Sequence, residues 1–210
     1  MVPPAAVASA DILRTMAHEL RQPLSTIESI AYYLALVLPP EDEKVHQHLD
    51  RIQRLVEQSS WIVTSAQQLA EPVRISVQPV RIDRLVEEIL AERSTAGDAA
   101  ETEIQSGLPA VNLDPAMARA LLINLLTLFR CIAKPGFPPQ LTLRADDVVT
   151  LELATGAIGY KSESSLGPGA TLSLESARRM VAAHGGSIDL RIDPGEGVRL
   201  RVLFAGVVLP

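Results

Sequence analysis

The sequence predicts an α+β protein in which a helical hairpin precedes a mixed sheet packed against helices. Residues 11–70 show helical periodicity, broken once by the prolines at 39 and 40. After residue 72 the pattern changes to short β-rich runs that alternate with amphipathic helices. The chain has 210 residues, 47% of them hydrophobic, which is ample for a buried core. We therefore expect a helical domain at 1–72 and an α/β sandwich at 73–210.

The first predicted helix spans about residues 11–38. Ser9 or Asp11 can cap its N-terminus, and the two prolines that follow it stop it. Pro23 lies inside this helix, where a proline removes one backbone hydrogen bond and should bend the helix. We expect the bend to expose the helix surface one turn before it.

The second predicted helix begins at residue 41 or 42 and ends at 69 or 70. One hairpin cannot cover both apolar stripes, so two hairpins should pair as a homodimeric four-helix bundle. The alternative is a plain coiled-coil dimerisation module, with His46 and His48 in solvent and Trp61 in the packing. The apolar positions of this helix alternate steps of four and three residues, a heptad pattern that lasts for three repeats: Val45, Leu49, Ile52, Val56, Ser59, Val63 and Ala66.

The second part of the chain should form a mostly antiparallel sheet with helices. Asp114 and Pro115 are a typical N-cap and first residue of a helix, and the glycines at 185 and 186 are typical of a helix end. The predicted helices span about residues 82–92, 115–133 and 174–184. The predicted strands span about residues 101–105, 110–113, 140–144, 148–153, 187–192 and 197–204.

Composition excludes several classes of function. The net charge of −6 argues against a nucleic-acid binder. Cys131 is the sole cysteine, so an intramolecular disulfide and most zinc-finger arrangements are excluded. The apolar stretches at 30–38 and 116–129 are too short or too interrupted to span a bilayer, and the first residues do not resemble a signal peptide. We expect a cytoplasmic protein that binds neither nucleic acid nor membrane.

His18 is the residue that carries the chemistry. At about 100° per residue, the imidazole should face water, where it can act as a nucleophile near neutral pH with Glu19 as an ionisable neighbour. Five polar residues share its face: Arg14, Thr15, Arg21, Gln22 and Ser25. Five apolar residues point roughly the opposite way: Leu13, Met16, Leu20, Ile27 and Leu34.

The segment His18-Glu-Leu-Arg-Gln-Pro-Leu24 resembles the H-box of bacterial two-component sensor histidine kinases, with a proline five residues after the histidine. The resemblance implies that His18 accepts and donates a phosphoryl group as phosphohistidine and that Glu19 is its acid/base partner. It also implies that a response-regulator receiver domain docks alongside.

The segment from Gly169 to Gly186 resembles the G2 segment of the ATP-binding domain of the same kinases, which has the Bergerat fold shared with gyrase and Hsp90. In that family the G2 segment is a glycine-rich loop that leads into a helix ending Ala-His-Gly-Gly. Together the two resemblances cover residues 12–209, nearly the whole chain.

This sequence departs from the family at the positions that bind the nucleotide and its metal ion in the kinases. In the register of the family, Leu128 replaces an asparagine that holds Mg²⁺, and a leucine has no oxygen to offer a hard cation. Ala154 stands at the position of the aspartate that binds adenine, and Ile158 at that of a glycine. Ala170 and Ser173 stand in the glycine-rich loop, where Cβ atoms obstruct the backbone cradle for phosphates. Residues 159–167 leave room for only a stub of the lid. We therefore expect that this chain binds no nucleotide, metal or other cofactor. We also expect that its second domain is a degenerate ATP-binding domain without autokinase activity.

The combination resembles the ChpT type of dimeric histidine phosphotransferase. That resemblance implies that His18 carries a phosphoryl group between receiver domains, which bring their own Mg²⁺. Arg14 and Arg21 could steer the acidic receiver pocket, with Thr15 and Ser25 in the same surface, and Gln22 could orient a water for dephosphorylation. Two alternatives remain: a non-catalytic pseudokinase adaptor for a receiver or partner kinase, and an active histidine kinase core that uses ATP.

Overall fold

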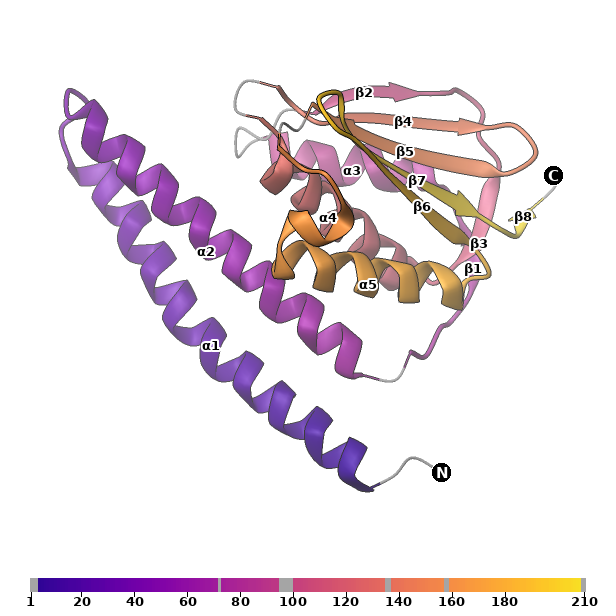
Figure 1. Cartoon of the computed structure of the whole chain (residues 1–210), viewed down its shortest axis with the longest axis horizontal. Coiled ribbons are helices and arrows are strands. Elements are labelled where there is room, and N and C mark those ends of the chain that lie inside the picture. The colour runs from indigo at the N-terminus through magenta and orange to yellow at the C-terminus, as the bar shows by residue number, and fades with distance from the viewer. Residues whose placement is uncertain (1–3, 72, 95–99, 135–136, 157–158, 209–210) are drawn as a thin grey trace. The chain divides into compact units, whose positions relative to one another are not determined.

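The computed structural model describes residues 4–71, 73–94, 100–134, 137–156 and 159–208 (Figure 1). The chain divides into two compact units, Met1–Pro72 and Val73–Pro210. Each unit has its own secondary structure, helical in the first and mixed in the second. The α+β class predicted from the sequence is confirmed.

The first unit is a hairpin of two long helices, α1 (Pro4–Val37) and α2 (Glu43–Ala70). α1 begins seven residues earlier than predicted from Asp11, because a proline is tolerated in the first turn of a helix and the alanine-rich residues that follow favour helix. In the connecting turn the Asp42 backbone N–H donates to the Pro39 carbonyl oxygen at 3.1 Å. His46 also contacts that carbonyl, 3.1 Å from its Nε2, so this histidine braces the turn.

The helices of the hairpin pack through small residues on α1 and part of the heptad pattern on α2. Ala17 and Ala31 are buried on α1, and Leu49 and Val56 on α2. Two other heptad positions, Val45 and Ile52, are exposed in the single chain, and the pairing of two hairpins stays a prediction. Small side chains let two helices approach closely, which leaves the longer apolar side chains on the flanks.

The second unit contains a five-stranded sheet of order β2-β4-β5-β7-β6, in which β2 and β4 are parallel and all other neighbours antiparallel. A smaller antiparallel sheet has the order β1-β3-β8. The strands are β1 (Gln78–Val80), β2 (Glu101–Ile104), β3 (Ala110–Leu113), β4 (Gln140–Ala145), β5 (Val149–Thr155), β6 (Ser187–Asp193), β7 (Gly197–Phe204) and β8 (Val207–Val208). The sequence missed β1 and β8, which are too short to show a periodicity.

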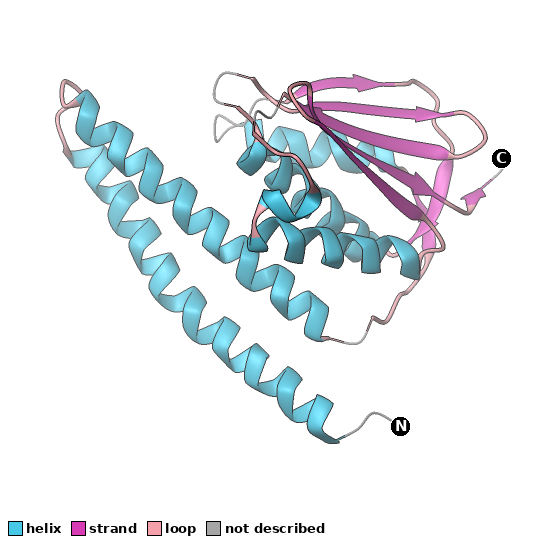
Figure 2. Ribbon diagram, viewed as in Figure 1, coloured by secondary structure: helices cyan, strands magenta, loops and turns pink. Residues whose placement is uncertain are grey.

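Three helices lie on one face of the five-stranded sheet (Figure 2): α3 (Ile82–Ser94), α4 (Pro115–Ile132) and α5 (Pro168–Ala183). A short 3₁₀ helix, η1 (Glu163–Leu166), precedes α5. The core lies between this helical layer and the sheet. Its largest fully buried side chains include Phe129, Leu125, Leu151, Leu174 and Leu200.

Asp114 ties three segments of this unit together. Its Oδ1 accepts the Met117 N–H at 3.0 Å, which is the predicted N-cap of α4. Its Oδ2 accepts the Ser76 N–H at 2.8 Å, and its own N–H donates to Nε2 of His184 at 3.0 Å. The segment before β1, the start of α4 and the end of α5 therefore meet at one residue.

α4 is the single helix in the described part of the chain that is long and apolar enough to cross a membrane, and 56% of that stretch is buried inside the structure.

Candidate functional site

His18 lies on α1 and is exposed, so the prediction that its ring faces solvent is confirmed. Gln22 follows one turn later, and the amide Nε2 of Gln22 lies 3.3 Å from Nε2 of His18. An amide N–H can donate there only to an unprotonated ring nitrogen, so this contact favours the tautomer with the proton on Nδ1. Gln22 thus bears directly on the state of the ring, a contact that helical spacing alone did not reveal.

Two arginines flank His18 along the same helix, and both are engaged with α2. The Arg21 guanidinium donates from Nη2 to Oε1 of Gln67 at 2.8 Å and to Oγ1 of Thr64 at 3.3 Å. Arg14 pairs with Glu71 at 3.5 Å. The sequence predicted both arginines as free steering charges. In the structure they also fix the two helices against each other, while their charges stay one turn from His18.

The remaining predicted site residues on α1 are all exposed: Thr15, Glu19 and Ser25. Glu19 follows His18 directly, so its carboxylate is available on the same stretch of helix surface. Ser29 donates its hydroxyl to the Ser25 carbonyl at 2.8 Å, which turns that hydroxyl back onto the helix.

In the second unit, α4 and α5 carry the residues that the family would use for nucleotide. Leu128 on α4 is 1% exposed, an aliphatic side chain inside the core where the family has a metal-binding asparagine. One turn earlier on α4, the buried Asn124 donates from Nδ2 to the Ser173 carbonyl at 3.2 Å. The Ser173 hydroxyl donates back to Oδ1 of Asn124. The sequence did not predict this pair, which joins the two helices inside the core.

The expected glycine-rich loop is already helix. The sequence predicted a helix from residue 174, whereas α5 begins at Pro168, so Ala170 and Ser173 are buried residues of its first two turns. The chain turns at Gly167, with φ of +90°, and Pro168 then takes the first helical position, where its missing N–H costs nothing. The Thr171 N–H donates to the Gly167 carbonyl at 3.1 Å, so the amides from this residue onward serve the helix and only those of its first turn point outward.

β5 alternates, with Leu153 and Thr155 buried on the side of the helices and Ala154 on the open face. The alignment of Ala154 with the adenine-binding aspartate of the family stays a prediction. An alanine has no side-chain oxygen that could accept a hydrogen bond from adenine. Ile158 lies outside the described residues.

The stub that replaces the lid is fastened to α5. Arg178 on α5 holds Glu163 of η1 through two hydrogen bonds of 2.6 and 2.8 Å, and it also binds Glu175. The Arg178 guanidinium holds the pKa of the Glu163 carboxyl below its usual value, and the carboxylates raise the pKa of Arg178. Among the described residues there is no group of three or more His, Cys, Asp or Glu placed to hold a metal ion.

Comparisons with known proteins give one consistent answer. No family model matches the chain. The sensor histidine kinase ZraS of Klebsiella oxytoca is 27% identical in an alignment of length 209 that covers 91% of this chain and 45% of that protein. ZraS of Escherichia coli K12 is 23% identical, and the signal transduction histidine-protein kinase AtoS of the same strain is 22% identical; they align with 91% and 92% of this chain.

The solved structures agree in architecture. Full-length ShkA, crystallised with AMPPNP, superposes with a TM-score of 0.61 at 20% identity over 95% of this chain and 46% of its own. The cytoplasmic segment of the histidine kinase QseC superposes with a TM-score of 0.55 at 13% identity over 72% of this chain and 94% of its own. The chain has the fold of a histidine kinase core. This histidine kinase-like core comprises the helical hairpin and the mixed domain that follows it.

This histidine kinase-like chain spans less than half the length of the curated relatives it matches, 45% for the first of them. Their names describe sensor kinases, and ShkA was crystallised with a nucleotide analogue. In this core, by contrast, the side chain of Leu128 is buried and has no oxygen to offer a metal ion.

Proposed function

We propose that this histidine kinase-like core is a histidine phosphotransferase of the ChpT type, in which His18 carries a phosphoryl group between response-regulator receiver domains. The observation that carries the proposal is the combination of an exposed His18 with a buried Leu128. The exposed His18 offers a nucleophile to a partner protein. The buried Leu128 removes a metal ligand that phosphorylation of His18 by a metal–nucleotide complex would need. We expect no cofactor on this chain.

The transfer step needs little beyond positioning. The unprotonated ring nitrogen of His18 attacks the phosphorus of an aspartyl phosphate on the receiver; the N–P bond forms as the P–O bond breaks, and the carboxylate leaves with the electron pair. Glu19 accepts the proton from the other ring nitrogen, so the phosphorylated ring loses its positive charge. The Mg²⁺ expected on the receiver would neutralise charge on the phosphoryl oxygens. The reverse step charges the second receiver.

The surface around His18 suits an acidic partner. Arg14 and Arg21 bring two positive charges to adjacent turns, already positioned by α2, so little side-chain entropy is lost when a receiver docks. Thr15 and Ser25 belong to the same exposed surface. Gln22 can orient either the ring or a water, and the second role would give the protein a phosphatase activity.

A homodimer is the second part of the proposal. α1 presents a stripe of large exposed apolar side chains, among them Met16 at 52% and Leu20 at 48% exposure. Leu13 and Ile27 extend the stripe. At about 25 cal/mol per Å² of buried apolar surface, a stripe of this length favours pairing with a second hairpin as a four-helix bundle. We place the protein in the cytoplasm, where receiver domains reside.

The decisive experiment is a phosphotransfer profile. Receiver domains of the host are phosphorylated with acetyl phosphate and mixed with the protein, and acid-labile phosphohistidine is measured. We expect one or a few receivers to label the protein at His18 and a second receiver to remove the label. His18→Gln should abolish labelling, whereas His48→Gln, a matched change on the exposed surface of α2, should leave it unchanged.

The other two functions give different results in the same assay. An adaptor would bind a receiver without becoming labelled, and His18→Gln would retain its activity in cells. An autokinase would be labelled directly by [γ-³²P]ATP and Mg²⁺ without any receiver. Either result would overturn the proposal.

A further inference from the structure

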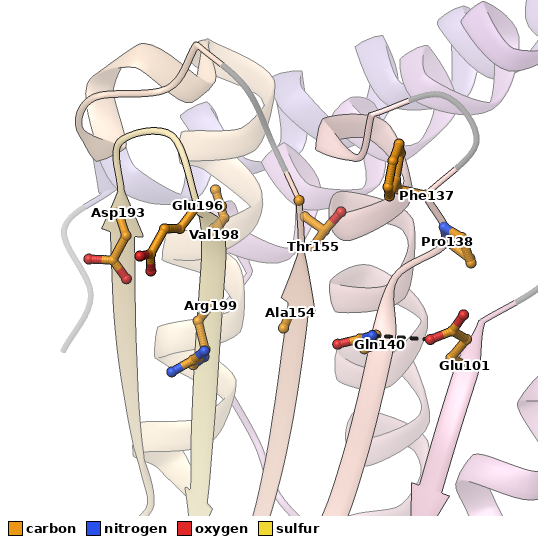
Figure 3. Close-up of a pocket in the computed structure, with 12 residues that line it drawn as sticks. Glu101, Phe137, Pro138, Gln140, Ala154, Thr155, Asp193, Glu196, Val198 and Arg199 are labelled. Atoms are coloured by element: carbon orange, nitrogen blue, oxygen red, sulfur yellow. Dashed lines mark hydrogen bonds between the residues drawn. The ribbon is translucent and has the colours of Figure 1, made fainter.

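The open face of the five-stranded sheet, opposite the helices, has a depression at one end. Ala154 forms its floor, because it is the smallest side chain in a row that runs across the sheet through Gln140, Ala154 and Arg199. The loop at Phe137 forms one wall, and the turn between β6 and β7 forms the opposite wall (Figure 3). The cavity has a volume of about 250 Å³. It does not involve α1 or the residues proposed for phosphotransfer.

The volume limits the size of an occupant. Sites for drug-sized ligands measure roughly 300–1,000 Å³, so this cavity suits a smaller molecule, about the size of an amino acid. The lining is mixed, with one exposed aromatic ring, that of Phe137, and several charged groups. A purely apolar or a purely anionic ligand would leave much of this lining unmatched.

Opposite charges line the cavity without neutralising each other. Arg199 is 55% exposed and is held only through Nε, 3.3 Å from Oε1 of Glu152 on the neighbouring strand. Its two terminal nitrogens make no ion pair with Asp193 or Glu196 in the described structure. Figure 3 shows these two carboxylates on the wall beside Arg199, with Ala154 on the other side of it. A group with adjacent negative and positive charges would pair with both.

Thr155 also borders this end of the cavity. Its side chain is only 6% exposed and is turned to the helical side of β5, so it offers no group to a ligand on the open face. In Figure 3 Thr155 lies between Ala154 and the Phe137 wall.

We infer that this cavity binds a small zwitterionic amino acid with an apolar side chain. The carboxylate of the ligand pairs with Arg199, its ammonium group pairs with Asp193 and Glu196, and its side chain lies over Ala154 against Phe137. Figure 3 places Asp193 and Glu196, then Arg199, then Ala154 and Phe137 across the cavity, so each part of an amino acid has a lining group within it. The proposal makes the second domain a metabolite-binding module, independent of the phosphotransfer proposed for His18.

The test is a titration of the full ¹⁵N-labelled chain with L-phenylalanine, followed by amide chemical shifts. We expect saturable shifts confined to Ala154, Thr155, Gly197 and their neighbours. Phenethylamine, which lacks the carboxylate, and 3-phenylpropanoate, which lacks the ammonium group, should each bind at least about tenfold more weakly. Equal affinity for all three compounds would show that the ring alone binds, and it would overturn the zwitterion assignment.

Four variants make the result specific. Ala154→Leu fills the floor and should abolish the shifts, and Arg199→Gln should weaken binding about tenfold. Thr155→Val changes a side chain on the helical side of β5 and should leave binding unchanged. Arg144→Gln, an exposed position of β4 that does not line the cavity, is the control and should bind normally. The same variants should retain phosphotransfer. Absence of saturation at about 20 mM, or unchanged binding by Ala154→Leu and Arg199→Gln, would overturn the inference.

Discussion

The side chains of Asn124 and Ser173 hydrogen-bond to each other inside the core, joining α4 to α5 where related kinases keep a glycine-rich phosphate loop. Ser173→Gly restores the glycine but removes the hydroxyl from this pair and weakens the helix. We expect a loss of about 1–3 kcal/mol in the free energy of unfolding. Urea denaturation measures it. Ser173→Ala, which keeps helix propensity, should lose less, and equal losses would show that the hydrogen bond contributes nothing.

Leu128→Asn restores the metal-binding residue of the family in sequence only. An amide placed among the buried side chains around Leu128 leaves polar atoms without partners and removes apolar packing. We expect a loss of about 2–5 kcal/mol, seen as a large fall in Tm, and no gain of Mg²⁺-dependent nucleotide binding. Leu128→Met, which keeps apolar volume, is the control. Saturable Mg²⁺–nucleotide binding by Leu128→Asn would show that the cleft is still formed.

Gln22 should control the tautomer of His18. With the amide 3.3 Å from Nε2, the resting ring should hold its proton on Nδ1. In ¹⁵N spectra of the imidazole, Gln22→Leu should shift the population toward the Nε2–H form. Since this readout needs no receiver, it stands apart from phosphotransfer. An unchanged spectrum would mean that the contact does not orient the ring; Gln47→Leu, on α2, is the matched control.

The Asp114 carboxyl should make the free energy of unfolding depend on pH in the acidic range. Backbone N–H donors, that of Met117 first and that of Ser76 second, hold the pKa of the Asp114 carboxyl below its usual value. Because the folded pKa is lower than the unfolded one, the stabilisation is complete above the unfolded pKa of about 3.9 and disappears as pH falls through the folded pKa.

The matching variant is Asp114→Ala, which removes the N-cap of α4. At pH 7 it should cost about 0.5–2 kcal/mol, and the difference from the native protein should shrink as pH falls below about 4. Thermal unfolding at a series of pH values checks this. Asp114→Asn keeps one capping oxygen, so its free energy of unfolding should lie between those of the native protein and Asp114→Ala. If the stability difference between the native protein and Asp114→Ala stayed constant down to pH 2, the charged Asp114 carboxylate would not be the source of the stabilisation.

The exposed stripe on α1 should hold a dimer. Met16→Lys introduces a charge into this stripe and should produce monomers, because an unpaired charge is costly to bury between helices. Sedimentation velocity distinguishes the two states. Ser29→Lys, a charge on the polar side of the same helix, should leave the dimer intact. A native protein that is monomeric at all concentrations would refute the bundle.

The sequence by itself determined the order of the elements and the exposure of His18. The strand Ala110–Leu113 and the strand Gly197–Phe204 lie where the alternation predicted them, and Asp114 caps α4 as its position before Pro115 required. These features depend on periods of 2 and 3.6 residues and on local hydrogen bonds, which adjacent residues specify.

Only the tertiary structure decided which residues meet. The pleat of β5 turns Thr155 to the helices and leaves Ala154 as the floor of the open-face cavity, which the motif alignment of Ala154 did not indicate. The segment that aligns with a glycine-rich loop forms the first turns of α5, and Ser173 meets a partner on α4 that is 49 residues away. Contacts between distant segments depend on how sheets and helices pack, so local patterns cannot contain them.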